Sequence, residues 1–334
     1  MTISSLRRKE TAMNTRKRVL AIVLAVLAAL AFAGTASPVG AATTTGPILW
    51  YNSANGSGAI GTIDETSNSH VTLRTYPAGA FATNWTHVVT TGSVDVGVRI
   101  LWYNSANGSG AIGTIDETSN SHVTLRIYPA GTFATNWTHV VALGSRILRY
   151  NSANGSGEIG TIDASNSHVT LRTYPAGTFA TNWTHVATVG PRILWYNSAN
   201  GSGAIDAILP SHLGHDHVTL RTYPAGAFAT NWTHVGTALG VPNRILWYNS
   251  ANGSGAIGKI DEPSNSHVTL RTYPAGAFAP HWTHVVYVGN LILWYNSANG
   301  SAAIGTVDAI KGHVTLRTYP AGAFATNWTH VAAA

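Results

Sequence analysis

One phrase recurs along this 334-residue chain and constrains its fold more than any other feature. It begins as Ile-Leu-Trp-Tyr-Asn at Ile48, and its tryptophan position, first Trp50, returns at residues 102, 149, 195, 247 and 294. A second phrase, Trp-Thr-His-Val, begins at residues 85, 137, 183, 232, 282 and 328. Six copies, spaced by 46 to 52 residues, therefore fill the chain from about residue 47 to its end.

Each copy has the pattern of four short β-strands. In the first copy we expect strands over residues 48–52, 59–64, 70–76 and 85–89, where aromatic and β-branched residues gather between turn-forming sequences. Within 70–76, strict alternation would place Val71 and Leu73 on the face opposite His70 and Arg74. No stretch of the repeats has the period of a helix.

Four strands in a unit of this length are typical of a propeller blade. The sequence therefore predicts an all-β fold, a six-bladed β-propeller of four-stranded blades. A β-solenoid is the alternative architecture. The last copy ends on residues 328–331, and we expect this C-terminal strand to pair with the N-terminal blade. Such pairing would close the ring without a disulfide, since the chain has no cysteine.

The first 42 residues predict a signal peptide. Arg16, Lys17 and Arg18 precede an apolar run over residues 19–33, and small residues at 39–42 suit cleavage near Ala41-Ala42. An uncleaved N-terminal anchor is the alternative. We expect a secreted, extracellular protein in which residues 43–334 form a single six-repeat domain, with no membrane span in the mature chain.

The charge of the repeats argues against nucleic acid as a partner. Of the 19 basic and 13 acidic residues, six basic and one acidic lie within residues 1–42, so the repeats carry 13 and 12. A net charge of about +1 offers no basic surface that could follow a phosphate backbone.

The acidic residues predict no enzyme. The recurrent acids are expected to accept hydrogen bonds in turns, and a symmetric ring of equal acids is a poor way to build one asymmetric active site. They are Asp64, Asp116, Asp163, Asp261 and Asp308, with no counterpart in the fourth copy. No catalytic residue is predicted.

Two rows of histidines follow the repeats, one led by His70 and the other by His87. Imidazoles bind zinc or copper, but no pair here has the close spacing of metal ligands. We expect buried rings that bond backbone groups between blades, and we predict neither a metal nor a cofactor.

Sugar recognition is the binding chemistry that the repeats suit best. It uses aromatic faces together with fixed amides and planar donors. The alternative for the aromatic residues is packing between blades, and for the asparagines ordinary turn chemistry. The candidate carbohydrate-binding residues are Trp50, Tyr51, Asn52, Asn55, Arg74, Tyr76, Asn84, Trp102, Asn104, Arg126, Asn136, Asn151, Arg172, Asn182, Trp195, Asn197, Arg221, Asn231, Trp247, Asn249, Arg271, Trp294, Asn296, Arg317 and Asn327.

The Asn-Trp strand, the Ile-Leu-Trp-Tyr-Asn strand and the Gly-rich turn together resemble the secreted β-propeller lectins of the tachylectin and tectonin type. This resemblance implies a sugar site in each blade or blade junction. We therefore expect a multivalent lectin that binds glycans or glycoconjugates without catalysis, its weak sites reinforcing one another. The alternative is a secreted protein-binding or adhesion scaffold without a sugar site. The oligomeric state stays open.

Overall fold

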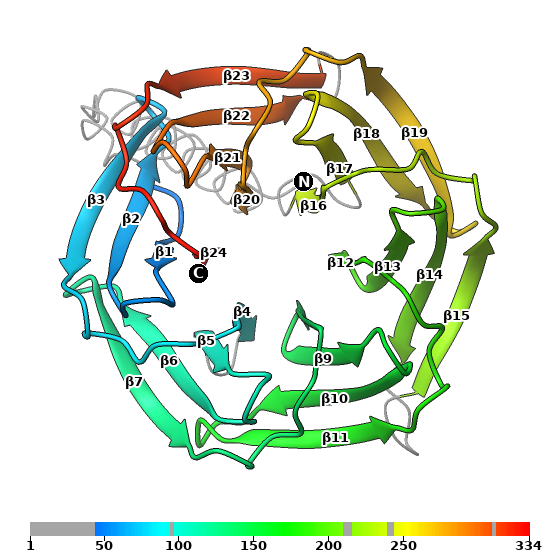
Figure 1. The fold of residues 1–334 in the computed structure, drawn as a ribbon, viewed down its shortest axis with the longest axis horizontal. Coiled ribbons are helices and arrows are strands. Elements are labelled where there is room, and N and C mark those ends of the chain that lie inside the picture. Colours follow the sequence, from blue (N-terminus) through cyan, green and yellow to red (C-terminus); the bar gives the residue numbers. More distant parts are fainter. Residues whose placement is uncertain (1–43, 94–96, 210–215, 239–243, 309–311) are drawn as a thin grey trace, which may run out of the picture. The chain divides into compact units, whose positions relative to one another are not determined.

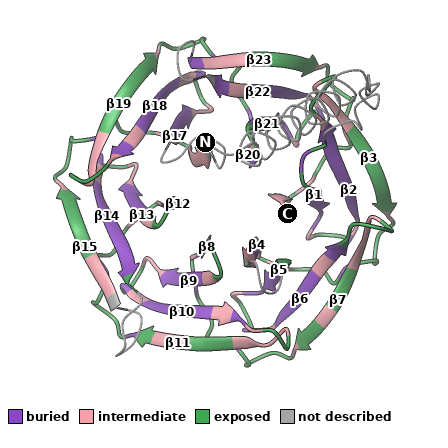
Figure 2. Cartoon of the chain, turned by 180° about the vertical axis from the view of Figure 1, so that it is seen from behind, coloured by how far each residue is buried: buried purple, intermediate pink, exposed green. Residues whose placement is uncertain are grey.

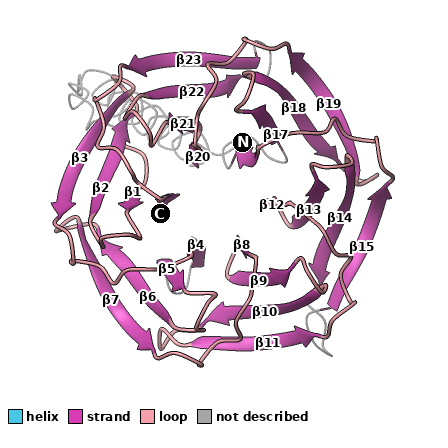
Figure 3. Ribbon diagram, in the orientation of Figure 1, coloured by secondary structure: helices cyan, strands magenta, loops and turns pink. Residues whose placement is uncertain are grey.

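The computed structural model describes residues 44–93, 97–209, 216–238, 244–308 and 312–334. Within these residues the chain forms 24 strands in six four-stranded antiparallel sheets, and no helix. The sheets follow one another around a ring, as the predicted six-bladed β-propeller requires (Figures 1 and 3). The predicted signal peptide and its cleavage site lie outside the described residues.

Each sheet is one blade, and its strands run from the centre of the ring to its rim in a fixed order. Blades 1 to 3 are β24 (His330–Ala333), β1 (Ile48–Tyr51), β2 (Gly58–Asp64), β3 (Ser69–Tyr76); β4 (His87–Ser93), β5 (Gly97–Tyr103), β6 (Gly110–Asp116), β7 (Ser121–Tyr128); and β8 (His139–Leu143), β9 (Arg146–Asn151), β10 (Ser156–Ile162), β11 (His168–Tyr174). Blades 4 to 6 are β12 (His185–Val189), β13 (Arg192–Asn197), β14 (Ser202–Leu209), β15 (Asp216–Tyr223); β16 (His234–Ala238), β17 (Arg244–Asn249), β18 (Ser254–Asp261), β19 (Ser266–Tyr273); and β20 (His284–Val288), β21 (Leu291–Tyr295), β22 (Ala302–Asp308), β23 (Gly312–Tyr319).

The ring closes through its two ends. Strand β24 pairs antiparallel with β1, from Tyr51 opposite His330 to Ile48 opposite Ala333. The last strand of the chain thus becomes the innermost strand of the first blade. The predicted closure is confirmed, and it ties the ring by backbone hydrogen bonds instead of a disulfide.

Two local details differ from the expected strands. The innermost strand of blade 2 begins at His87 and not at residue 85, because Asn84 has a positive φ of 68° and turns the chain just before it. In β3, a bulge opposite Ile60 and Gly61 makes Leu73 an extra residue. Strict alternation along residues 70–76 was therefore wrong, because a bulge reverses the facing of the residues beyond it.

The core lies in the seams between neighbouring blades. Figure 2 shows the second and third strands buried and the outermost strands largely exposed. At one seam the Trp50 ring meets Tyr295 of the preceding blade edge-on, with centroids 5.0 Å apart, and it also packs on Phe324. The same tyrosine–tryptophan contact recurs in four of the other five seams, so that each blade buries the face of the next.

A ring of histidines also links all six innermost strands. His87 Nε2 donates to the carbonyl of Thr138 in the next blade, while its Nδ1 accepts from the Thr86 hydroxyl at 2.9 Å. Every blade repeats this contact at 3.1–3.3 Å, and His330 closes the circle onto Thr86. Burial is the main cause that lowers the pKa of these rings. The inter-blade backbone bonds expected of this row are confirmed.

The second row of histidines lies inside the seams. His70 packs against Trp50 with centroids 5.6 Å apart, and against Phe324 at 4.8 Å. Burial lowers the pKa of this ring to about 4, so that it is neutral at physiological pH. The same value of about 4 holds for His122, His267 and His313.

We expect acid to destabilise the ring as the pH falls from about 6.5 to about 4. Above pH 6.5 these histidines are neutral in both states and cost nothing. Below pH 6.5 the histidines of the unfolded chain become protonated, whereas the buried rings of the folded protein stay neutral until the pH approaches 4. Each ring with a folded pKa of about 4 therefore lowers the free energy of unfolding by up to about 3 kcal/mol. Urea unfolding followed by tryptophan fluorescence at pH 7 and pH 5 measures this loss. A free energy of unfolding that is constant over this interval would contradict buried, neutral rings.

Candidate functional site

The tryptophans predicted to bind sugar are core residues. Trp50, Trp102, Trp195, Trp247 and Trp294 are at most 2% exposed. Each ring is enclosed by aromatic residues of its own and the neighbouring blade. None of the five offers an exposed face on which a pyranose could stack, so their assignment to a sugar site is corrected.

The residues that follow Trp50 hold the strand and the turn together. Tyr51 is buried, and its hydroxyl donates to the carbonyl of Ala82 at 2.7 Å. Asn52 and Asn55 accept backbone N–H groups two residues further along, from Ala54 and Ser57. The bond made by Asn52 recurs at Asn104, Asn151, Asn197, Asn249 and Asn296. These side chains form the Asx turns that the alternative interpretation anticipated.

Arg74 and Tyr76 connect blades at the rim. The guanidinium of Arg74 donates to the carbonyls of Ser119 and Asn120 in the next blade, and the Tyr76 hydroxyl accepts the backbone N–H of His122 at 2.7 Å. Arg126, Arg221 and Arg317 reach a serine carbonyl of the next blade in the same way. Arg172 lies over the Tyr174 ring, and Arg271 lies beside Gly312.

The remaining candidates shape the loop that enters each innermost strand. Asn84, Asn136, Asn182, Asn231 and Asn327 have positive φ angles of 66–70°, a conformation that asparagine tolerates better than most residues. Their side chains are exposed, and each amide donates to the preceding threonine hydroxyl at 3.2–3.4 Å. The fold therefore accounts for the recurrence of these asparagines. A functional site must be sought where the copies differ.

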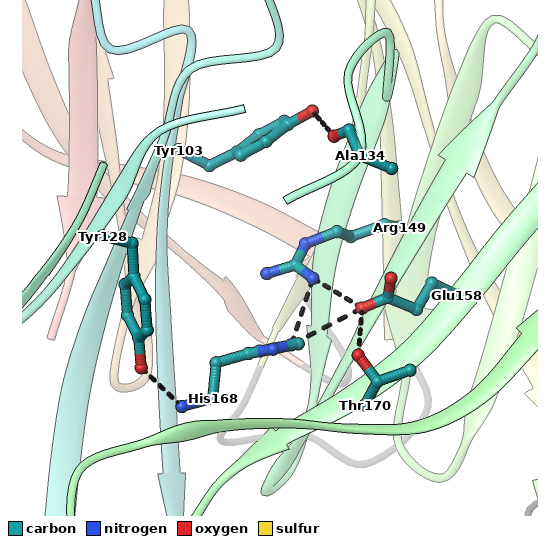
Figure 4. Close-up of polar contacts among 7 residues, drawn as sticks. All are labelled: Tyr103, Tyr128, Ala134, Arg149, Glu158, His168 and Thr170. Atoms are coloured by element: carbon teal, nitrogen blue, oxygen red, sulfur yellow. Dashed lines mark hydrogen bonds and ion pairs between the residues drawn. The ribbon is translucent and has the colours of Figure 1, made fainter. Parts of the chain in front are cut away.

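One such difference is a buried charged cluster in blade 3. Arg149 stands where the other copies have tryptophan, and Glu158 pairs with it across the strands where the others have alanine. Figure 4 shows Arg149 Nη1 bonded to Glu158 Oε1 at 2.6 Å and to His168 Nε2 at 3.0 Å. The Thr170 hydroxyl donates to the same carboxylate oxygen at 3.2 Å.

This cluster is sealed inside the seam between blades 2 and 3. The side chains of Arg149, Glu158 and His168 are 1%, 11% and 5% exposed, and the guanidinium stacks 4.5 Å from the centre of the Phe133 ring. Burial and the charge of Arg149 lower the pKa of His168 to about 3, so the imidazole is neutral and accepts from Arg149. Burial also lowers the pKa of Arg149, and Glu158 opposes that effect. A neutral histidine beside a buried ion pair, closed to solvent, suits a structural role.

The innermost strands enclose a central channel. It measures about 1070 Å³ and is lined by the six innermost strands, chiefly by valine, alanine, threonine and glycine. That volume is at the upper end of the range of small-molecule sites, and apolar walls with few polar groups are typical of them.

The charged side chains that line the described channel are Arg244 and Glu262, and both belong to blade 5. Arg244 begins β17 opposite Ala238, the last residue of β16, and Glu262 directly follows β18. Both therefore lie at the end of the channel where the innermost strands finish. Arg192 of blade 4 donates to Glu262 Oε1 at 2.5 Å and to Asn265 Oδ1 at 2.5 Å. The result is an asymmetric charged end on an otherwise near-symmetric ring.

The sequence interpretation missed these residues because it searched for what the copies share. Asp64-Glu65, Asp116-Glu117 and Asp261-Glu262 occupy the same turn, and only the last glutamate lines the described channel. The sequence does distinguish Glu262 through its neighbours, because the fifth copy departs from the repeat at Lys259 and Pro263. In the described residues, no group of three or more histidine, aspartate or glutamate side chains is arranged to hold a metal ion.

Comparison with known proteins defines the class of the fold. No protein-family model and no curated protein sequence matches the chain. A solved structure from Bacteroides fragilis, provisionally named a 6-phosphogluconolactonase, has a TM-score of 0.57 and 12% identity over 87% of this chain and 98% of its own. The periplasmic gluconolactonase of Pseudomonas aeruginosa has a TM-score of 0.53 and 11% identity, over 85% and 98%. A Bacteroides uniformis protein with the same provisional name as the first has a TM-score of 0.52 and 15% identity, over 83% of each chain.

The chain is thus a β-propeller, which confirms the fold that the tachylectin and tectonin resemblance implied. The lectin function is corrected, because these structures bear the names of lactonases and the predicted sugar residues serve the fold. The lactonase names of these structures also correct two further predictions, that the protein is no enzyme and that it is alternatively a binding scaffold. In the described residues no helix has the length and apolar character to cross a membrane.

The blade 3 cluster generates a stability prediction. The double substitution Arg149→Trp with Glu158→Ala restores the pair that the five other blades use, so we expect a folded ring with unchanged or increased stability. Arg149→Trp alone leaves Glu158 buried without its cation and is expected to lower the free energy of unfolding by about 3–5 kcal/mol. Urea unfolding at pH 7 compares the three proteins. Equal stability of the single and double variants would contradict a buried ion pair.

Proposed function

We propose that this protein is a hydrolase of small cyclic esters, the lactones of sugars, and that the reaction takes place at the charged end of the central channel. The observation that carries the proposal is one carboxylate, Glu262, which is held by Arg192 and shares with Arg244 the wall of a cavity lined chiefly by small residues. The names of the solved structures that share the fold support the choice of lactones.

The chemistry needs a base and a group that stabilises negative charge. Glu262 is 52% exposed on its side chain and is oriented by Arg192, so it is placed to accept a proton from water. The oxygen of that water adds to the lactone carbonyl, and the Arg244 guanidinium stabilises the resulting oxyanion. When the ring C–O bond breaks, the proton passes to the departing ring oxygen. Lactone and water are thereby converted to one hydroxy acid.

The asymmetry of the ring suits a single reaction centre. Glu117 occupies in blade 2 the turn position that Glu262 occupies in blade 5, but it does not line the described channel. Arg99 of blade 2 corresponds to Arg244, and its Nε donates to Asn166 of the next blade. The repeats therefore supply matched controls for both groups within the same chain.

Glu262→Gln is expected to lower kcat for D-glucono-δ-lactone by about a hundredfold or more, because removal of a general base has effects of about 10²–10⁴. Glu117→Gln is expected to leave kcat unchanged. Acid release at constant pH measures the rate, after subtraction of spontaneous hydrolysis with heat-denatured protein. Equal activity of the two variants, or no hydrolysis by the unsubstituted protein of this lactone and its 6-phosphate, would reject the proposal.

Export of the protein is part of the proposal. It is supported by the basic segment and apolar run within residues 1–33, and one solved structure with this fold is named as periplasmic. Expression of the full chain in a bacterium should place activity outside the cytoplasm, and N-terminal sequencing of the exported form should begin near residue 43. A full-length N-terminus on the exported protein would favour the uncleaved anchor.

A further inference from the structure

The innermost strands differ sharply at one position. Tyr287, the fourth residue of β20, is a large aromatic residue on the wall of the channel. The same position in the other five strands holds a small residue. These are Thr90, Ala142, Thr188, Thr237 and Ala333.

A second departure makes room for this ring. Gly236 of β16, in the adjacent blade, stands where the other innermost strands have valine or alanine. A Cβ atom on Gly236 would lie 2.7 Å from Cε2 of Tyr287, which is closer than packed atoms approach. The glycine and the tyrosine are therefore a matched pair, and the ring occupies the seam between blades 5 and 6.

Within the part of the chain that the structure describes, Tyr287 packs through its ring alone. Its ring packs with Leu246 and Ile292, and the residue is 9% exposed, on the channel. The Tyr51 hydroxyl donates to a carbonyl and the Tyr76 hydroxyl accepts an N–H, but the Tyr287 hydroxyl makes no hydrogen bond to the described residues. Burial raises its pKa well above the usual value, so that it keeps its proton.

Tyr287 lies on the same side of the channel as the charged end. Arg244 pairs with the last residue of β16, and Val288 is the last residue of β20. Arg244 and Val288 therefore lie at the same depth along the channel. Tyr287 is thus one residue deeper in the channel than Arg244. A lactone whose carbonyl meets Arg244 and Glu262 would place its far side toward this phenol.

We propose that Tyr287 determines specificity by donating a hydrogen bond to a ring hydroxyl of the lactone. This inference rests on the proposed lactonase function and assigns a residue that would recognise the hydroxyl groups of a sugar lactone. A donor built to meet a hydroxyl discriminates strongly against the analogue that lacks it. An unsubstituted lactone such as δ-valerolactone gains nothing from Tyr287.

The test compares two lactones and two variants. Tyr287→Phe keeps the ring that fills the seam and removes only the hydroxyl. It is expected to lower kcat/KM for glucono-δ-lactone about ten- to a hundredfold and to leave that for δ-valerolactone unchanged. Thr90→Val, which removes a hydroxyl from the same repeat position two blades away, is expected to change neither. An equal effect of Tyr287→Phe on both lactones, or no effect, overturns the inference and leaves lactonase activity standing.

Binding separates this inference from the function on which it rests. Gluconate, the hydroxy acid formed from the lactone, carries the same hydroxyl groups and is not consumed, so calorimetry can measure its Kd for each variant. Weaker binding to Tyr287→Phe than to Thr90→Val supports the inference even if hydrolysis is absent. Equal binding to both variants, or no binding to the unsubstituted protein, overturns it.

Discussion

The seam between neighbouring blades is the constraint on which the structure depends. A single four-stranded sheet leaves both faces of its second and third strands uncovered, and only the next blade can bury them. Trp50, Tyr295 and Phe324 meet at one such seam, and four of the other five seams use the same tyrosine–tryptophan contact. Because every blade needs two neighbours, stability requires a closed ring, and the pairing of β24 with β1 completes it.

The polar residues of the repeat serve the same end. The His87 row joins the blades at the channel, and the Arg74 and Tyr76 rows join them at the rim. Each bond satisfies a backbone group that would otherwise face the neighbouring blade unpaired. The features that suggested a sugar site, namely aromatic rings beside amides and a planar donor, are here the contacts that hold one blade to the next.

Function is therefore sought in the departures from the repeat. Two of them form compensating pairs: Arg149 with Glu158 replaces a tryptophan and an alanine, and Tyr287 with Gly236 replaces a threonine or alanine and a valine or alanine. Only the second pair reaches the channel. Such local changes make the cavity of a near-symmetric ring asymmetric. The fold tolerates them because a second substitution in a contacting residue compensates for the change in size or charge.

The sequence alone determined the number of blades, their four strands and the closure of the ring. These features depend on the spacing of the repeats and on the strand patterns, which are present in every copy. It also anticipated that Asn52 could be a turn residue and that the histidines could join blades. The sequence could not decide whether the indole of Trp50 binds a sugar or packs between blades, because both roles require the same side chain. Nor could it bring Glu262, Arg244 and Tyr287 to one cavity. Their positions depend on which strands stand innermost, on the register of β17 with β16, and on the facing of one blade against the next, and only the assembled ring supplies these.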